Sequence, residues 1–250
     1  MSNSSLVNYT AMSPYKTSPR KKTIDAVIVH CMAGNFSVET LGNIFQRPNK
    51  NASSTYGIGS DGRIGQYVDE KDRAWCSGGT DKNKKIIRVN GISGADWDQR
   101  AISIEVANDG GAPDWHVSDK ALESLVNLLV DICQRNGIKK LLWKNDKTLV
   151  GKIDQQNMAL HRWFSTKSCP GNYLVSKHAF IMEQVNSRLN GEKPVDGQNT
   201  QAEQYYTVVK GDTMTKIAIK FNTSLPELKR LNPQIKNISL IIVGQKIRVK

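Results

Sequence analysis

A chain of 250 residues fits one domain of ordinary size and one small domain, at roughly 150 residues per domain. The hydrophobic fraction of 38%, with 5 Trp, 7 Tyr and 5 Phe, excludes wholesale disorder, and no run approaches the ~20 apolar residues that a membrane helix needs. The net charge of +12 favours a polyanionic partner, but the common nucleic-acid recognition motifs are missing, so we expect an anionic cell wall rather than nucleic acid.

The first third of the chain alternates predicted strands with a helix. Residues 24–30 are β-branched and apolar, which predicts a short buried strand that ends at His30. Ser37 is a suitable N-cap for a helix that extends to about Gln46. Two short apolar runs within 56–68 flank an Asp-Gly pair, and this arrangement predicts a β-hairpin.

The middle of the chain predicts another strand and two long helices. Residues 77–99 are rich in Gly, Asp, Asn and Lys, and we expect a long loop there. Residues 101–107 alternate as a strand whose isoleucines share one face, so Glu105 should point to the other face. Apolar residues recur at helical spacing over 118–137 and again over 173–189. This mixture predicts an α/β domain whose helices pack on a central sheet.

The rest of the chain divides into a linker and a basic segment. Residues 191–204 contain Pro, Gly and polar side chains with almost nothing to bury, which is typical of a linker. Residues 205–250 carry nine basic and two acidic residues, a net charge of +7. The sequence therefore predicts a larger domain over 1–190, a linker over 191–204 and a small basic domain over 205–250.

Two of the four histidines stand in unusual settings. His30 ends an apolar strand, where open α/β sheets carry functional groups, and His161 follows an apolar run and precedes Cys169 by eight residues. Two neutral imidazoles and one thiolate form a known catalytic zinc set, with water in the fourth position. On spacing alone, hydrogen-bonded structural histidines remain the alternative, and that is our interpretation of His116 and His178.

Five motifs in chain order connect these residues to a known family. They are Val27-Ile-Val-His-Cys-Met-Ala-Gly34, Ser60-Asp-Gly-Arg-Ile-Gly-Gln-Tyr-Val68, Arg73-Ala-Trp75, Ala101-Ile-Ser-Ile-Glu105, and His161 with Lys167-Ser-Cys-Pro-Gly171. Together they resemble the type-2 N-acetylmuramoyl-L-alanine amidases, relatives of phage lysozyme-like amidases and peptidoglycan-recognition proteins, over about residues 20–190. The resemblance implies a mixed central sheet with flanking helices. It also implies a hydrolase that holds one Zn²⁺ through His30, His161 and Cys169 and cuts the amide between N-acetylmuramic acid and L-alanine.

The resemblance further implies two catalytic side chains. Glu105 matches the catalytic carboxylate of some family members, and Lys167 matches a functional lysine two positions before the last ligand. Negative charge builds on the carbonyl oxygen during amide hydrolysis, and Lys167 would stabilise it. A carboxylate must take a proton from water and pass it to the leaving amine, which is the role implied for Glu105. The alternative for Glu105 is a surface glutamate on a strand face.

The chain departs from the family pattern at two positions. Ser54 stands where many relatives have a catalytic tyrosine, seven residues before Asp61, whereas Tyr56 matches an aromatic packing position. Cys76 stands where members often have histidine, and we do not expect it to be a ligand. Whether Ser54 or Cys76 assists catalysis stays open. Cys31 should point away from His30 along the strand and pack in the core.

Residues 205–250 resemble a second family. The pattern consists of Tyr206-Thr-Val-Val-Lys-Gly-Asp-Thr213, Ile217-Ala218, Phe221, Leu228, Leu231-Asn-Pro233 and Val243-Gly-Gln-Lys-Ile-Arg-Val249. It is similar to the LysM module, which implies a small βααβ fold that binds glycans containing N-acetylglucosamine. The implied groove lies between the loop of Gly211, Asp212 and Thr213 and the segment near Ile241.

The two resemblances predict a peptidoglycan amidase that takes a muropeptide at its catalytic domain and is held on the wall by LysM, as an endolysin or an autolysin. The alternative is a catalytically silent peptidoglycan-recognition protein, against which the ligand set and Glu105 argue. Residues 1–22 lack the apolar segment of a secretory signal. We therefore expect synthesis in the host cytoplasm and action on the wall after release, with export of an autolysin by another route as the alternative.

Overall fold

The computed structural model describes residues 3–192, 204–221, 223, 225–235 and 237–249. The chain divides into two compact units, Met1–Pro194 and Val195–Lys250, which are described separately below. Most of the linker predicted over 191–204 lies outside the described residues. Among the described helices, none combines the length and the apolar character that crossing a membrane requires.

The first unit is built around a sheet with both parallel and antiparallel pairs. In spatial order its strands are β1 (Tyr9–Thr10), β5 (Ile64–Gln66), β4 (Tyr56–Ile58), β9 (Ala101–Val106), β3 (Ala26–Cys31) and β10 (Met158–Ala159). Only the β4–β5 hairpin is antiparallel within this sheet. The central strands β3 and β9 are apolar and mostly buried on both faces, as is typical of strands covered from two sides. The prediction of a mixed central sheet is confirmed.

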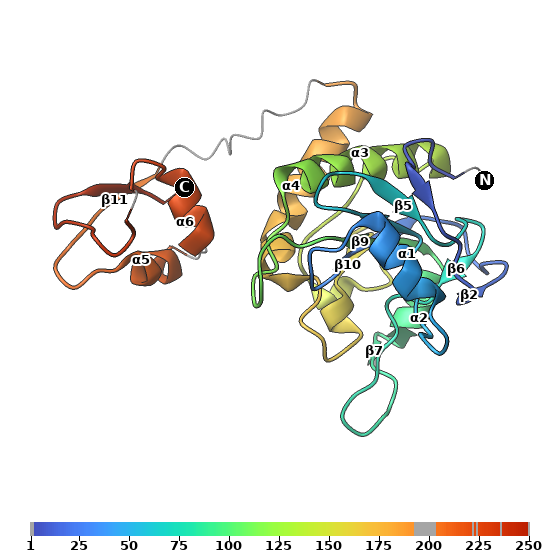
Figure 1. The fold of residues 1–250 in the computed structure, drawn as a ribbon. Coiled ribbons are helices and arrows are strands. Elements are labelled where there is room, and N and C mark those ends of the chain that lie inside the picture. Colours follow the sequence, from blue (N-terminus) through green and yellow to red (C-terminus); the bar gives the residue numbers. More distant parts are fainter. Residues whose placement is uncertain (1–2, 193–203, 222, 224, 236, 250) are drawn as a thin grey trace. The chain divides into compact units, whose positions relative to one another are not determined.

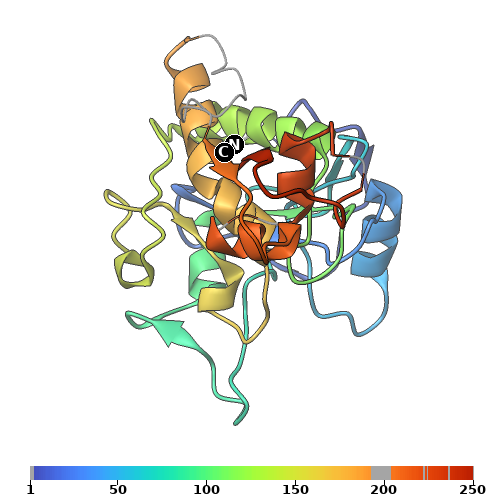
Figure 2. The same cartoon turned by 90° about the vertical axis from the view of Figure 1, so that its left-hand side faces the viewer.

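Two long helices cover one face of this sheet. They are α3 (Asp119–Asn136) and α4 (Gly171–Leu189), which lie side by side in Figures 1 and 2. Their apolar side chains form one core with Val27 and Val29 of β3 and Ile102 and Ile104 of β9. Ser118 caps α3 and Gly137 ends it in the left-handed conformation, as the sequence predicts.

Shorter elements complete the first unit. They are α1 (Val38–Gln46), the pair β2 (Lys16–Thr17) and β6 (Arg73–Ala74), the pair β7 (Arg88–Val89) and β8 (Ile92–Ser93), α2 (Gly94–Asp98), and the 3₁₀ turns η1 (Lys147–Leu149) and η2 (His161–Trp163). Ser37 caps α1 as predicted. The opposite face of the sheet is covered by a second core that includes Trp97 of α2 and Trp163 of η2.

The prediction of a continuous loop over 77–99 is wrong in its second half, which contains β7, β8 and α2. The side chains of Ser93 and Asp96 form a capping box that starts α2, and Trp97 is completely buried beneath it. The polar composition of the segment gave no indication that Trp97 would be buried in the core. In both views a strip of this segment projects from the body of the unit (Figures 1 and 2).

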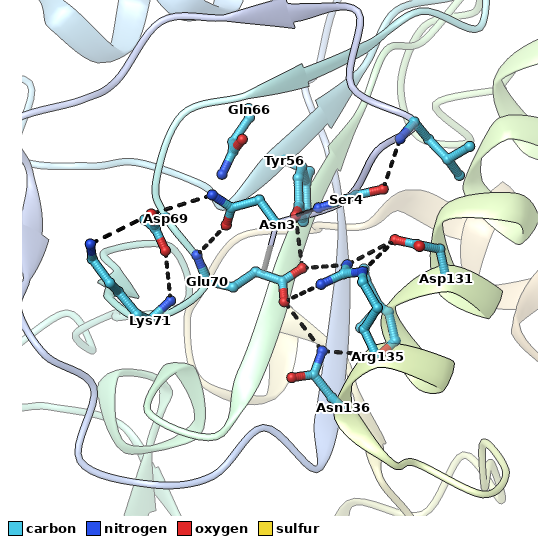
Figure 3. Close-up of polar contacts among 12 residues, drawn as sticks. Asn3, Ser4, Tyr56, Gln66, Asp69, Glu70, Lys71, Asp131, Arg135 and Asn136 are labelled. Carbon is cyan, nitrogen blue, oxygen red and sulfur yellow. Dashed lines mark hydrogen bonds and ion pairs between the residues drawn. The ribbon is translucent and has the colours of Figure 1, made fainter. Parts of the chain in front are cut away.

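A buried polar cluster fastens α3 to the loop after β5 (Figure 3). The guanidinium of Arg135 donates to both carboxyl oxygens of Glu70, at 2.8 and 2.7 Å. The side-chain amide of Asn136 and the hydroxyl of Tyr56 donate to the same carboxyl group. The backbone N–H of Ser4 donates to that hydroxyl in turn, so the cluster also holds the N-terminal segment.

The second unit has the element order β–α–α–β. It contains β11 (Tyr205–Thr207), α5 (Met214–Lys220), α6 (Leu225–Leu231) and β12 (Lys246–Arg248), with the two strands antiparallel. The buried side chain of Asn232 donates to the carbonyls of Leu228 and Arg248 and accepts from the Arg248 N–H, which ties the end of α6 to β12. The predicted βααβ fold is confirmed.

Candidate metal centre

The register of two central strands brings His30 and Glu105 together. In the parallel pair β3–β9, His30 is aligned with Glu105. Side chains alternate along a strand, and the neighbours Val29 and Ile104 belong to the core beneath α3 and α4. His30 and Glu105 therefore share the other face of the sheet, at its carboxyl edge.

Two further donors reach His30 from the end of β10 and the start of α4. Nδ1 of His161 lies 3.2 Å from Nδ1 of His30, and Sγ of Cys169 lies 3.4 Å from the same nitrogen. All three side chains are buried. The backbone N–H of Arg162 donates to the carbonyl of Cys169, which couples η2 to the turn before α4. The structure thus gathers the three residues that the sequence predicts as ligands.

The protonation states of these groups suit a cation. Burial lowers the pKa of His30 well below its ordinary value, and burial lowers the pKa of His161 to about 4. Both rings are therefore neutral at pH 7 and offer lone pairs. Burial raises the pKa of the Cys169 thiol well above its ordinary value. A metal ion would draw off that proton, so binding should release it.

The spacing of the donors also suits zinc. Bonds of about 2.0–2.1 Å to nitrogen and 2.3 Å to sulfur in a tetrahedron separate the ligand atoms by about 3.3–3.6 Å. The separations of 3.2 and 3.4 Å, both measured from Nδ1 of His30, are close to these values, and all three donor atoms lie within 4.8 Å of one another. Two nitrogens and one sulfur match the catalytic zinc sites that keep a fourth position for water or substrate.

Glu105 and Lys167 face the same cavity, which has a volume of about 500 Å³. Burial raises the pKa of Glu105 to about 8, and the nearby Lys167 opposes this shift. Oε2 of Glu105 is buried without a hydrogen-bond partner among the described residues, and Oε1 lies 4.0 Å from Sγ of Cys76. A carboxyl group in such a setting is available to exchange a proton with a bound molecule.

The cavity wall is mostly apolar but also carries polar and charged side chains. Its remaining lining residues are Cys31, Met32, Ala33, Phe36, Leu41, Ile44, Phe45, Lys50, Ala52, Ser53, Trp75, Cys76, Trp115, His161, Ser168 and Cys169. His161 and Cys169 thus border a cavity that can admit a ligand with both apolar and polar groups, whereas His30 lies behind them and does not line it.

The three positions that the sequence left in question differ in their placement. The hydroxyl of Ser54 is completely buried and hydrogen-bonds to the carbonyls of Tyr56 and Ser103, and Ser54 does not line the cavity. Cys76 does line it, and its donor atom groups with those of His30 and Glu105. Cys31 belongs to the core as predicted, but it also borders the cavity.

Sequence reasoning missed two residues at this centre. Asp98 is buried at the end of α2, and its carboxyl group accepts hydrogen bonds from the backbone N–H groups of Cys76 and Ser77 and from the Ser77 hydroxyl. That hydroxyl lies 3.4 Å from Nε2 of His30. In the sequence, Asp98 only follows Trp97 within a polar segment. This local pattern does not indicate a contact with His30, which lies 68 residues earlier in β3.

The predicted glycan-binding residues of the second unit lie at one end of its two strands. Asp212 accepts hydrogen bonds from the Val209 N–H and the Tyr206 hydroxyl, and Thr213 caps α5. Gly211 has a positive φ of 91° in this turn. Val208 is hydrogen-bonded to the backbone of 244–245, so the 209–213 turn and the segment before 244 leave the sheet at the same end.

That second segment presents apolar side chains to solvent. Leu240, Ile242 and Val243 are 70, 73 and 63% exposed, whereas Ile241 packs partly against the core of the unit. Exposed apolar residues that gather beside a polar turn are typical of a ligand-binding surface.

Comparisons with known proteins agree with the two-unit organisation. A family model described as N-acetylmuramoyl-L-alanine amidase matches residues 20–172, and one described as LysM domain matches residues 206–250. The crystal structure of the Staphylococcus aureus hydrolase AmiA in complex with its ligand is similar in fold, with a TM-score of 0.51 at 15% sequence identity, over 74% of this chain and 86% of that one.

Two curated proteins are similar to this chain over shorter stretches. An endolysin of Bacillus phage PZA is 52% identical over 88 residues, which make up 35% of this chain and 34% of the relative. A chlorophenol reductase of Desulfitobacterium hafniense is 52% identical over 56 residues, 22% of this chain and 17% of the relative. The chain thus spans about a third or less of the length of these relatives.

Proposed function

The chain belongs to the N-acetylmuramoyl-L-alanine amidase family, and from this premise we propose that it hydrolyses the amide bond between N-acetylmuramic acid and L-alanine in peptidoglycan with the help of one zinc ion. His30, His161 and Cys169 would hold the ion. The observation that carries the proposal is the convergence of three buried donor atoms, two of which belong to residues that line the cavity. Zinc bound there would polarise the scissile carbonyl and lower the pKa of water toward 7.

Glu105 is the proton-transferring group in this proposal. Its carboxyl group lines the cavity, and its pKa of about 8 is closer to neutrality than that of an exposed glutamate. A group that must take a proton from water and return it to the leaving amine works best when its pKa is near the working pH. The unpartnered Oε2 leaves one oxygen free for this exchange.

Lys167 supplies positive charge at the same cavity. It lies two residues before Cys169 in the turn that leads to α4, and its charge already lowers the pKa of both ligand histidines. Negative charge develops on the carbonyl oxygen when water adds to the amide. A cation held near that oxygen stabilises it in the transition state more than in the substrate.

The second unit would hold the enzyme on its substrate. We assign residues 1–190 to catalysis, 191–204 to the linker and 205–250 to wall binding. Gly211, Asp212, Thr213 and Ile241 would contact glycans that contain N-acetylglucosamine, and the net charge of +7 would add a salt-sensitive attraction to anionic wall polymers. Tethering raises the effective concentration of the catalytic unit at the wall without new contacts to the scissile bond.

The similarity to a phage endolysin supports a role in lysis. In that role the protein is made inside the host cell and acts on the cell wall after it is released. An autolysin would perform the same chemistry on its own cell's wall. Both roles predict the same reaction products, so the reaction itself is the first thing to test.

The decisive experiment digests purified peptidoglycan and identifies the products by mass spectrometry. We expect new L-alanine N-termini, loss of their release on chelation, and recovery on addition of zinc. Release of reducing sugars would instead identify a glycosidase, and binding without any product would identify a recognition protein. A variant truncated after residue 190 should bind whole walls less tightly but cleave small soluble muropeptides at the rate of the full chain.

A further inference from the structure

A chain of polar contacts leads from α2 to the metal-facing histidine of β3. Oδ1 of Asp98 accepts a hydrogen bond of 2.5 Å from the Ser77 hydroxyl, and that hydroxyl oxygen lies 3.4 Å from Nε2 of His30. All three residues are at least 98% buried. The opposite nitrogen of the same ring, Nδ1, is the one that faces His161 and Cys169.

The donors and acceptors in this chain can be assigned from their chemistry. Burial raises the pKa of Asp98 to about 6, so its carboxyl group is mostly ionised above neutral pH and can only accept. Ser77 has one hydroxyl proton, and it donates this proton in the hydrogen bond to Asp98. The Ser77 oxygen can then only accept from His30, so Nε2 must be the ring nitrogen that carries the proton. A neutral ring has one such proton, and Nδ1 is left with its lone pair.

The surrounding structure holds this chain in place. Asp98 also accepts from the backbone N–H groups of Cys76 and Ser77, at 3.1 and 2.8 Å. At the other end of α2, Gly94 lies so close to the Ser77 carbonyl that an added Cβ would be 1.8 Å from its oxygen. With the capping box at its start and Trp97 buried beneath it, α2 is a rigid support for the loop that carries Ser77.

We infer that Asp98, acting through Ser77, is a positioning residue that keeps His30 in the tautomer and ring orientation needed to bind the metal through Nδ1. The inference rests on the proposed function for the identity of the metal ion. Partners of this kind on metal-binding histidines commonly change metal affinity by 10- to 100-fold when they are altered.

The sharpest test is Asp98→Asn, because the change keeps shape while it reverses the hydrogen bonds. The backbone N–H groups of Cys76 and Ser77 need an oxygen, so the new amide should turn its oxygen to them and its NH₂ group toward the Ser77 hydroxyl. That hydroxyl must then donate to Nε2 of His30, and the ring proton moves to Nδ1, where it blocks the metal. If Asp98 had only a structural role, Asp98→Asn, which is nearly isosteric, should disturb the protein less than Ser77→Ala, which removes the hydroxyl.

Two measurements read out the effect without relying on activity. In ¹⁵N-histidine-labelled, metal-free protein, NMR should show the Nε2–H tautomer for His30 in the wild type and the Nδ1–H tautomer in Asp98→Asn. Zinc affinity, measured by competition with a chromogenic chelator, should fall by about 10- to 100-fold in Asp98→Asn. Ser77→Ala should lose the tautomer preference and part of the affinity, and Ser77→Thr, which keeps a hydroxyl, should restore both.

Ser124→Ala is the matched control, because Ser124 is a half-buried serine on α3 whose hydroxyl donates to the Gly62 carbonyl, and neither residue lines the cavity. It should leave the tautomer of His30 and the zinc affinity unchanged. The inference is overturned if Asp98→Asn or Ser77→Ala keeps both the Nε2–H tautomer and the wild-type zinc affinity. Failure of the wild type to bind zinc would instead overturn the proposed function, and the tautomers of the metal-free proteins would still decide the role of Asp98.

Discussion

The first unit buries polar side chains in two clusters of opposite character. Around Glu70, every carboxyl oxygen has a partner, supplied by Arg135, Asn136 and Tyr56 (Figure 3). Around His30, buried atoms remain without partners among the described residues, namely Nε2 of His161 and Oε2 of Glu105.

We interpret the Glu70 cluster as structural and the His30 cluster as functional. A buried charge whose hydrogen bonds are all satisfied within the protein is costly to deprive of a partner, and it has little capacity left to bind a ligand. Oε2 of Glu105, by contrast, is a buried polar atom beside the cavity with no partner among the described residues, and such an atom costs stability unless a ligand binds it. Glu70 is the more deeply buried of the two glutamates, yet it is Glu105 that has a carboxyl oxygen without a partner among the described residues.

The largest effect is expected when a ligand is removed from the His30 cluster. Cys169→Ala should bring the zinc content to background and abolish amidase activity, because the remaining two imidazoles cannot hold zinc in competition with buffer. Metal analysis of the purified protein together with product analysis checks this. Cys133→Ala, at a buried cysteine in the core side of α3, is the control and should keep zinc. Stoichiometric zinc in Cys169→Ala would refute the proposed ligand set.

The next largest effect concerns Glu105 and Lys167, the two groups that we propose to act on the substrate. Glu105→Gln and Lys167→Ala should each lower kcat by ~10²-fold or more and retain zinc, because each removes a proton-transfer or charge-stabilising group but no ligand. Glu39→Gln, at an exposed glutamate on α1, is the control for Glu105 and should have wild-type kcat. Full activity in Glu105→Gln would show that another group transfers the proton.

Breaking the Glu70 cluster should have the opposite signature. Arg135→Ala leaves a buried carboxyl group without its main partner and should lower the free energy of unfolding by about 3–5 kcal/mol. Zinc affinity per folded molecule should not change. Urea unfolding and chelator competition measure the two quantities. Arg63→Ala removes an ion pair with Glu39 that is more than 40% exposed on both sides, and it should cost at most about 1 kcal/mol. A fall in the zinc affinity of Arg135→Ala would show that the Glu70 cluster also contributes to metal binding and would contradict its assignment as purely structural.

His178 belongs to neither cluster, and its burial leads us to expect that stability depends on pH. Its Nδ1 donates to the Leu174 carbonyl, Nε2 is unpartnered among the described residues, and burial lowers the pKa to about 4. Because the unfolded chain binds this proton near pH 6.5, the stability that neutral His178 contributes is present above that pH and is lost as the pH falls toward 4, by up to about 3 kcal/mol.

The measurement is the difference in free energy of unfolding between the wild type and His178→Gln from pH 7 to pH 4. The slope with pH should be smaller in the variant, since His30 and His161 contribute equally to both proteins. Parallel curves would show that His178 is protonated in the folded state as easily as in the unfolded one.

Much of the fold followed from local pattern. The strand that carries His30, the helix capped by Ser118, and the βααβ order of the second unit were all predicted, because alternation and helical spacing record which face of an element is buried. The 77–99 segment was mispredicted because its two buried hydrophobic residues, Val89 and Trp97, are eight positions apart, a spacing that shows neither strand alternation nor a helical face.

The sequence motifs were sufficient to identify His30, His161, Cys169, Glu105 and Lys167 as candidate site residues. Each motif is a short local pattern, so it can be recognised without knowledge of the rest of the fold. The distances among them, and the roles of Ser77 and Asp98, depended on strand register and on the docking of α2. Hydrogen bonds form between groups that folding brings within about 3 Å, and no local pattern encodes which distant serine will lie beside a given imidazole.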